Sequence, residues 1–280
     1  MDCIKITNLR VFAHHGVFPQ ETEDGQDFYV NAGLYLDCRK AGGSDALEDS
    51  IDYGEVCHFI TDFLQNNTYR LLEAAAEHVA SELLLGWRAQ GLRAVDVELC
   101  KPHAPIGLPF ENVSVSLHRE WHRVYLSIGS NIGDREAYLR GAVERLSKER
   151  SIAVRRVSDF LRTKPYGGVE QEDFLNAAVD LDTLLAPGEL LALLHTIERQ
   201  AGRTRKVHWG PRTLDLDIIF YDGLAYEDEA LVIPHVDMQN RDFVLRPLLQ
   251  LCPNYRHPLL HRTVRQLYQE LAGREVSKQQ

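Results

Sequence analysis

The order of strand and helix patterns in the first 120 residues restricts the fold more than any other feature of the chain. Four segments with alternating apolar and polar residues predict strands with one covered face: 2–12, 26–37, 95–99 and 113–117. Between the second and third strands, residues 56–64 and 71–87 place apolar side chains at helical spacing. This order predicts an α+β unit, an antiparallel sheet with helices on one face. Such a sheet leaves two free edges, which are often covered by other subunits.

A second series of patterns begins almost without a gap. The last strand of the first series ends at Glu120 and another alternating strand begins at Val124, with no Gly-, Pro- or Ser-rich linker between them. A chain of 280 residues is long enough for two hydrophobic cores. We therefore predict two α+β domains, 1–120 and 122–280, joined as a rigid tandem.

Composition restricts the partners and the compartment. The chain has 31 Lys and Arg against 41 Asp and Glu, and the net charge of −10 argues against nucleic acid or an anionic membrane as the main partner. Its five cysteines are scattered and form no Cys-x-x-Cys motif, which is typical of reduced thiols. We expect no signal peptide, and no apolar run approaches the ~20 residues of a membrane span. We expect a cytoplasmic protein.

Two acidic residues on one predicted strand indicate a metal site. Within 214–220, apolar residues alternate with Asp215 and Asp217, so both carboxylates project from the same face. Unpaired, they would repel each other, and a Mg²⁺ shared with substrate phosphates removes that repulsion. Five basic residues precede the pair closely: Arg203, Arg205, Lys206, His208 and Arg212. The combination predicts a nucleotide phosphate site, and the alternative is a solvated face of an edge strand.

The same stretch resembles a known family. Residues 208–219 read His-x-Gly-Pro-Arg-x-x-Asp-Leu-Asp-Ile-Ile, which resembles the signature of the folate-pathway enzyme hydroxymethyl-dihydropterin pyrophosphokinase. This resemblance extends from about Val124 to the end of the chain, and the first 120 residues resemble dihydroneopterin aldolase. It implies a ring-forming, tunnelling-fold aldolase domain with active sites between subunits, followed by a ferredoxin-like kinase domain. The implied function is cleavage of dihydroneopterin to hydroxymethyl-dihydropterin and glycolaldehyde, then ATP-dependent pyrophosphorylation with release of AMP.

The aldolase resemblance also implies roles for individual residues. It assigns substrate binding to Ile51, Leu72 and Glu73, with Glu73 holding the amino-pyrimidine edge of the pterin through paired hydrogen bonds. It makes Lys101 and Tyr53 the proton-transfer groups and places Glu21 near the side-chain hydroxyls. By pattern alone, each of these residues also has an ordinary explanation, such as a helix charge or a strand-end lysine.

The kinase resemblance assigns most of the remaining candidates. It implies pterin binding by Thr163, Tyr166, Phe174 and Asn176. It implies ATP binding by Glu198, Arg205, Trp209, Ile218, His235 and Arg241. It implies that Arg203 and Arg212 neutralise charge in catalysis and that Asp215 and Asp217 bind two Mg²⁺ ions. Lys164, His208 and Val236 depart from the residues usual in the family.

The glycine-containing segment 129–134 is interpreted as a turn and not as a phosphate-binding loop. Gly129 to Asp134 follows a strand and opens a helix, but it lacks the Gly-Lys-Ser/Thr of a P-loop. We interpret its glycines as a tight turn and Asp134 as the helix N-cap.

Other functions and mechanisms remain open. The first half could be a non-catalytic pterin-binding scaffold and the second a nucleotide sensor, although the matched site residues argue against both. Cleavage could use a Schiff base on Lys101 or a zinc ion. Dihydroneopterin carries a ring imine that already accepts electrons, so we expect an aldolase domain without metal or cofactor. His14 and His15 are adjacent on a strand, point to opposite faces and cannot chelate one ion together; we expect a structural or oligomer contact.

Overall fold

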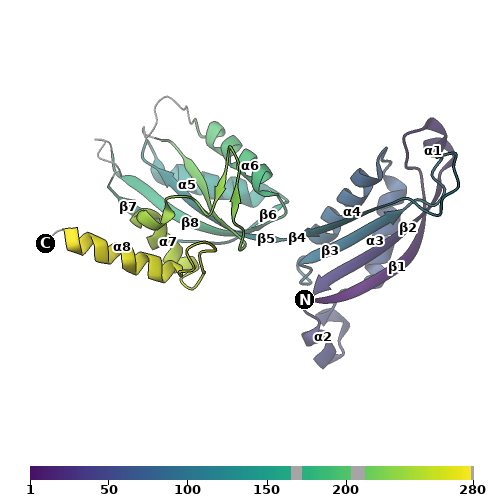
Figure 1. Cartoon of the computed structure of the whole chain (residues 1–280), viewed down its shortest axis with the longest axis horizontal. Coiled ribbons are helices and arrows are strands. Elements are labelled where there is room, and N and C mark those ends of the chain that lie inside the picture. Colours follow the sequence, from purple (N-terminus) through teal and green to yellow (C-terminus); the bar gives the residue numbers. More distant parts are fainter. Residues whose placement is uncertain (165–171, 203–211, 279–280) are drawn as a thin grey trace. The chain divides into compact units, whose positions relative to one another are not determined.

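Each half of the chain is built on one large antiparallel sheet. The computed structural model describes residues 1–164, 172–202 and 212–278, and the chain divides into two compact units, Met1–Trp121 and His122–Gln280. Both units combine a sheet with helices, which confirms the predicted α+β class (Figure 1). No described helix is both long and apolar enough to cross a membrane.

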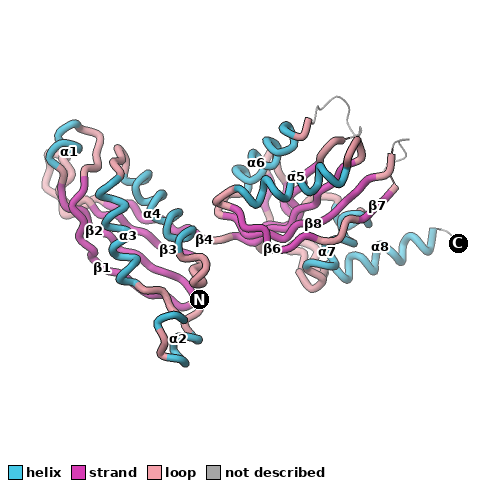
Figure 2. Tube along the Cα trace, turned by 180° about the vertical axis from the view of Figure 1, so that it is seen from behind, coloured by secondary structure: helices cyan, strands magenta, loops and turns pink. Residues whose placement is uncertain are grey.

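The sheet of the first unit pairs its strands in chain order. These strands are β1 (Asp2–Ala13), β2 (Gln26–Leu36), β3 (Ala94–Cys100) and β4 (Ser114–Glu120). Helices α3 (Tyr53–Asn66) and α4 (Leu72–Gly86) cover one face of it, as Figure 2 shows. The connections contain α1 (Pro19–Asp24), α2 (Arg39–Ser44) and the 3₁₀ turn η1 (Leu47–Asp49). Every second side chain of β2, from Phe28 to Leu36, is buried against the helices, as the alternation predicts.

The two long helices of this unit run antiparallel. Phe63, near the end of α3, stacks on Tyr69 just before α4, with ring centroids 6.4 Å apart. Phe59, one turn earlier in α3, meets Trp87 at the end of α4, with centroids 5.2 Å apart. The start of α3 therefore lies at the opposite end of the helix pair from the start of α4. Each α-helical residue rises about 1.5 Å, so the 14 residues of α3 separate these ends by roughly 20 Å.

The second unit has the connectivity of a ferredoxin-like fold. Its main elements follow one another as β5 (His122–Ser130), α5 (Arg135–Lys148), β6 (Ile152–Val157), β8 (Phe174–Thr183), α6 (Pro187–Gln200) and β9 (Asp215–Tyr221). The strand order is β6-β8-β5-β9, and β7 (Leu161–Thr163) pairs with the start of β8. This βαββαβ arrangement with the two central strands β8 and β5 is the ferredoxin-like topology. A small separate ladder joins β10 (Tyr226–Glu227) to β11 (Val232–Ile233).

Helices cover both faces of this second sheet. Apolar residues of α5 and α6 form one core with β5, β8 and β9. A second core lies on the other face, under α7 (Asp242–Leu251) and α8 (Val264–Lys278), which follow the 3₁₀ turn η2 (Met238–Asn240). Neither α7 nor α8 was predicted from the sequence.

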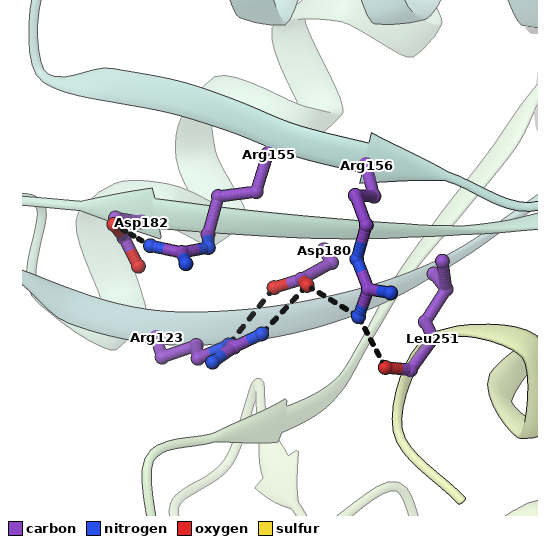
Figure 3. Close-up of polar contacts among 6 residues, drawn as sticks. All are labelled: Arg123, Arg155, Arg156, Asp180, Asp182 and Leu251. Carbon is purple, nitrogen blue, oxygen red and sulfur yellow. Dashed lines mark hydrogen bonds and ion pairs between the residues drawn. The ribbon is translucent and has the colours of Figure 1, made fainter.

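A buried carboxylate links α7 to the sheet through an arginine. Asp180 on β8 is fully buried and accepts hydrogen bonds from Arg123 Nε at 3.0 Å and Nη2 at 2.8 Å. Arg156 contacts the same carboxylate at 3.4 Å and also donates to the carbonyl of Leu251, the last residue of α7 (Figure 3). Because charges in an interior need partners, this network fixes the helix that begins directly after Arg241.

Candidate functional sites

A buried ion pair occupies one end of the first unit. Lys101 directly follows β3, and its Nζ lies 2.5 Å from Glu21 Oε1 and 3.3 Å from the main-chain oxygen of His15. Lys101 is 7% exposed and Glu21 is 8% exposed. Buried charges are stable only when paired and hydrogen-bonded, and both conditions are met here.

Local sequence explains how Glu21 reaches this position. Pro19 starts the short helix α1, where a missing N–H costs nothing, and Glu21 Oε2 accepts the N–H of Phe18 at 3.0 Å. Gly16 is required nearby, because a Cβ there would lie 2.3 Å from the Glu21 carboxylate. Burial by itself would raise the pKa of Glu21, but the hydrogen bonds from Lys101 and Phe18 outweigh it and leave that pKa below its ordinary value.

His15 adjoins this ion pair, although the sequence analysis gave it no catalytic role. Its side chain is 1% exposed, and its Nδ1 accepts the N–H of Tyr69 at 3.2 Å. Burial, followed by the nearby Lys101 charge, lowers the pKa of His15 to about 4, so the ring is neutral at neutral pH. His14 instead is partly exposed and contacts the carbonyl of Thr22.

The remaining aldolase candidates divide between the two ends of the unit. Leu72 and Glu73 form the first turn of α4, next to Tyr69 and therefore at the end that holds His15. Glu73 is exposed. Tyr53, 63% exposed, begins α3 at the opposite end, and Ile51 lies buried just before it. One copy of the unit brings Glu21 and Lys101 together with the end that starts α4, but does not bring Tyr53 to them.

In the second unit, one row across the sheet joins the predicted pterin and metal residues. Gly129 of β5 pairs with Asn176 of β8 on one side and with Asp215 of β9 on the other. Directly paired residues of antiparallel strands share a face, so Asn176 and Asp215 flank the glycine. A Cβ on Gly129 would lie 2.8 Å from Asn176 Oδ1. The interpretation of Gly129 as a turn residue was wrong, because this glycine lies inside a strand and leaves space between the two side chains.

Two other residues of the segment 129–134 have the roles that were predicted from the sequence. Asp134 Oδ1 accepts the N–H of Ala137 at 3.0 Å, which confirms it as the N-cap of α5. Gly133 has the left-handed φ of +64°, as a turn glycine does.

The pterin candidates beside this row form a small polar group. Asn176 is buried, and its Nδ2 donates to Thr163 Oγ1 at 2.8 Å. Phe174, at the start of β8, pairs with Thr163 in the short β7–β8 ladder and is half-buried. This amide and hydroxyl, with an aromatic ring two residues away, suit the polar edge and flat face of a pterin. Tyr166 lies outside the described residues.

The acid pair lies at the start of β9 with a cation close to it. Arg212 Nη1 forms an ion pair with Asp215 Oδ2. Two bonds hold the main chain of Arg212 to Asn131: its N–H donates to Asn131 Oδ1 at 2.7 Å, and its carbonyl accepts the Asn131 N–H at 3.0 Å. Sequence reasoning missed Asn131, and its place directly after the strand that carries Gly129 was the only available signal.

The charge of this pair fits a divalent cation. Burial and the Asp215 carboxylate raise the pKa of Asp217 well above its ordinary range, although Arg241 and Arg212 oppose the shift. A nearby dication would oppose that shift by favouring the ionised carboxylates. Among the described residues no group of three or more His, Cys, Asp or Glu could hold a metal. Mg²⁺ needs only one or two carboxylates when phosphates and water complete its shell.

The other nucleotide candidates surround the acid pair. Glu198 is buried at the end of α6, and its Oε1 accepts the N–H of Leu216, between the two aspartates, at 2.8 Å. Ile218 is 3% exposed and its side chain belongs to the core. Arg203, Arg205 and Trp209, like Lys206 and His208, lie outside the described residues.

His235 and Arg241 approach from the segment before α7. The main-chain N–H of His235 donates to the carbonyl of Ile219 on β9 at 3.2 Å, and its Nδ1 accepts the N–H of Asp237 at 3.3 Å. Burial, followed by the Arg241 charge, lowers the pKa of His235. Arg241 Nε contacts Asp237 Oδ2 at 3.1 Å, a partner that the sequence analysis did not identify.

Comparison with known proteins finds a matching family for each half of the chain. A family model described as 7,8-dihydro-6-hydroxymethylpterin-pyrophosphokinase matches residues 125–253, and one described as dihydroneopterin aldolase matches residues 4–118. The 2-amino-4-hydroxy-6-hydroxymethyldihydropteridine pyrophosphokinase of Bacillus subtilis is 49% identical over 128 residues, which cover 46% of this chain and 77% of that protein. The chain belongs to the pyrophosphokinase family and carries a dihydroneopterin aldolase domain in front of it.

Two longer relatives are also similar to this chain, one over 45% of it and the other over 95% of it. The bifunctional protein FolKE of Lactococcus lactis is 53% identical over 127 residues, covering 45% of this chain and 36% of that protein. The folic acid synthesis protein FOL1 of Dictyostelium discoideum is 31% identical over 294 residues, covering 95% of this chain and 44% of that protein. The chain therefore spans less than half the length of these two relatives.

Proposed function

We propose that the chain is a bifunctional enzyme of folate biosynthesis whose units catalyse successive reactions. The first unit cleaves dihydroneopterin to hydroxymethyl-dihydropterin and glycolaldehyde, and the second transfers pyrophosphate from ATP to the new hydroxymethyl group with release of AMP. The observation that carries this proposal is the row of Asn176, Gly129 and Asp215 across the second sheet. It puts an amide suited to a pterin edge beside an acid pair suited to metal-bridged phosphates.

In the first unit, Lys101, Glu21 and Tyr53 serve as the proton-transfer groups. Removal of a proton from the side-chain hydroxyl beside the breaking carbon–carbon bond turns that carbon into a carbonyl, and glycolaldehyde leaves. The bond electrons move into the ring imine, and a proton then returns to the carbon that stays on the pterin. Because the ring accepts the electrons, the reaction requires neither a lysine Schiff base nor a metal.

Substrate binding in this unit requires a second copy of the chain. Glu73, at the start of α4, binds the amino-pyrimidine edge through two charge-assisted hydrogen bonds, with Leu72 beside it. Tyr53 and Ile51 lie at the far end of the unit, so a neighbouring subunit supplies them. The outer edges of β1 and β4 have no partner strand among the described residues, and subunits join there into a ring.

In the second unit, the hydroxymethyl oxygen attacks the β-phosphorus of ATP in line with the departing AMP. Thr163, Phe174 and Asn176 orient the pterin, and positioning supplies most of the catalysis. Arg212 and Arg241 neutralise the charge that develops on the phosphates, and His235 contacts them as a neutral donor. Asp215 and Asp217 would hold two Mg²⁺ ions, which would supply Lewis-acid stabilisation of the phosphates when bound.

A single assay tests both activities. The full chain is incubated with dihydroneopterin, ATP and Mg²⁺, and products are followed by mass spectrometry. We expect glycolaldehyde, hydroxymethyl-dihydropterin pyrophosphate and AMP. Addition of a chelator should stop formation of the pyrophosphate and leave glycolaldehyde release unchanged. Absence of glycolaldehyde would contradict the aldolase proposal, and absence of AMP with supplied hydroxymethyl-dihydropterin would contradict the kinase proposal.

A further inference from the structure

His15 connects the two halves of the aldolase site that lie in one copy of the first unit. Its main-chain oxygen accepts from Lys101 Nζ at 3.3 Å, and its Nδ1 accepts from the N–H of Tyr69 at 3.2 Å. The next residue, Gly16, donates its N–H to the carbonyl of Tyr69 at 3.0 Å. Residues 15 and 16 thus hold both main-chain polar groups of Tyr69, three residues before Leu72 and the turn that contains Glu73.

These contacts require a neutral ring with one particular tautomer. A main-chain N–H can only donate, so the Nδ1 that faces Tyr69 must keep its lone pair. The proton of the neutral ring therefore lies on Nε2. A charged imidazolium would lose the Tyr69 contact and would add a second cation beside Lys101. The depressed pKa of His15, which follows from burial and the Lys101 charge, agrees with this arrangement.

Packing does not account for a histidine at this position. Nε2 is buried and has no hydrogen-bond partner among the described residues. The ring lies against Phe28, with centroids 5.1 Å apart, and against Tyr69, with centroids 5.7 Å apart. A leucine would fill a similar apolar space without an unpaired donor, and a buried unpaired donor destabilises a fold. The acceptor at Nδ1 is what a leucine lacks.

We propose that His15 is a positioning residue of the aldolase reaction, a neutral imidazole that holds the Lys101–Glu21 pair in register with the helix turn that carries Glu73. This inference rests on the proposed aldolase function of the first unit. His15 does not exchange a proton with the substrate. It fixes the distance between the proton-transfer pair and the group that anchors the pterin, and small misplacements of such groups cost rate.

The test compares two substitutions in the full chain. His15→Asn retains an acceptor near the position of Nδ1, and His15→Leu has none. The same two substitutions at the neighbouring His14, which contacts neither Lys101 nor Tyr69, serve as matched controls. Glycolaldehyde release gives kcat and KM for dihydroneopterin, and the pyrophosphokinase reaction of the second unit calibrates the amount of active chain in each sample.

We expect His15→Leu to lower kcat by about 10- to 100-fold with KM within about threefold of the parent chain, because binding groups remain while their alignment with Lys101 is lost. His15→Asn should recover most of that loss, and both His14 variants should stay within about threefold of the parent kcat. A kcat of His15→Leu within threefold of the parent, or equal losses in the Asn and Leu variants, would overturn the inference. A parent chain that phosphorylates its pterin but releases no glycolaldehyde would instead refute the proposed function.

A measurement on the unsubstituted chain covers the case in which His15→Leu does not fold. Nitrogen-15 spectra of histidine-labelled chain should include, for His15, the signals of a neutral ring with a protonated Nε2 and a bare Nδ1 from about pH 6 to pH 8. Its signals should be absent from the His15→Asn chain. A His15 ring that carries its proton on Nδ1, or that becomes charged in this range, would overturn the inference.

Discussion

Lys101 and Glu21 bury one cation against one anion, whereas Asp215 and Asp217 place two carboxylates on the same face of one strand. In the first pair hydrogen bonds from Lys101 and Phe18 outweigh burial and lower the pKa of Glu21, whereas in the second burial and the neighbouring carboxylate raise the pKa of Asp217. The first site is charge-balanced by protein groups alone. In the second, Arg212 pairs with Asp215, but the two carboxylates exceed that single positive charge, and in the proposed function a bound dication would balance them.

The difference follows from the two chemistries that we propose. A retro-aldol cleavage moves protons and needs groups that exchange them in place, which a fixed lysine–carboxylate pair provides. A pyrophosphoryl transfer must compensate the charge of a polyphosphate, for which a bound dication would act together with Arg212 and Arg241. The same comparison predicts which substitutions affect one reaction and spare the other.

The largest effect should come from removing a charge of the unbalanced site. Asp217→Asn should lower pyrophosphoryl transfer by about 1,000-fold or more, because several kcal/mol of charge stabilisation depend on the ion that this carboxylate holds. Glycolaldehyde release by the same chain should stay near the parent rate and serves as the internal control. Most of the transferase activity surviving at ordinary Mg²⁺ concentrations would refute the metal assignment.

The balanced site should respond less and independently of metal. Lys101→Ala should slow glycolaldehyde release by about 10²- to 10⁴-fold, as for other general acid–base groups, and leave pyrophosphoryl transfer unchanged. Lys5→Ala in the same unit is the control. Borohydride added during turnover should trap no adduct on Lys101; a trapped lysine–substrate adduct would show that the pair acts by a covalent mechanism instead.

Pterin anchoring in the first unit should show a smaller effect. Glu73→Gln should raise KM for dihydroneopterin about 10- to 100-fold, since charge-assisted hydrogen bonds contribute about 1.5–3 kcal/mol each. Affinity of the second unit for hydroxymethyl-dihydropterin should not change. Glu77→Gln, one turn later on α4 and paired with Arg119, is the matched control. If both activities fell together with loss of assembly, Glu73 would have a structural role.

The smallest effect should be a change in acid stability. The folded pKa of Glu21 is depressed, so the stability that its ionised form contributes is present above its ordinary value of 4.5 and is lost as pH falls through the folded pKa. Glu21→Gln cannot lose a charge, so its stability should depend less on pH in that acidic range. Denaturant unfolding of both chains at several acidic pH values measures this. If the free energies of unfolding of the two chains changed in parallel with pH, ionisation of Glu21 would not contribute to stability.

Several parts of the site could be read from local sequence. The capping of α5 by Asp134 and the shared face of Asp215 and Asp217 follow from residues close together in the chain. The family resemblance added the roles of residues such as Glu73 and Asn176, which their local pattern leaves ambiguous. The helices α7 and α8 were missed, and with them the buried Asp180 network that holds α7.

The sequence by itself determined the alternation and helical spacing that make both units α+β, because these periods depend only on neighbours along the chain. Only the tertiary structure decided which residues, distant in the chain, contact one another. Lys101 and Glu21 are 80 residues apart, and His15 and Tyr69 are 54 apart. Gly129 lies between Asn176 and Asp215 because strand register puts it there. The alternation within one strand fixes which face each side chain takes, but not which strands, distant in sequence, lie on either side of it.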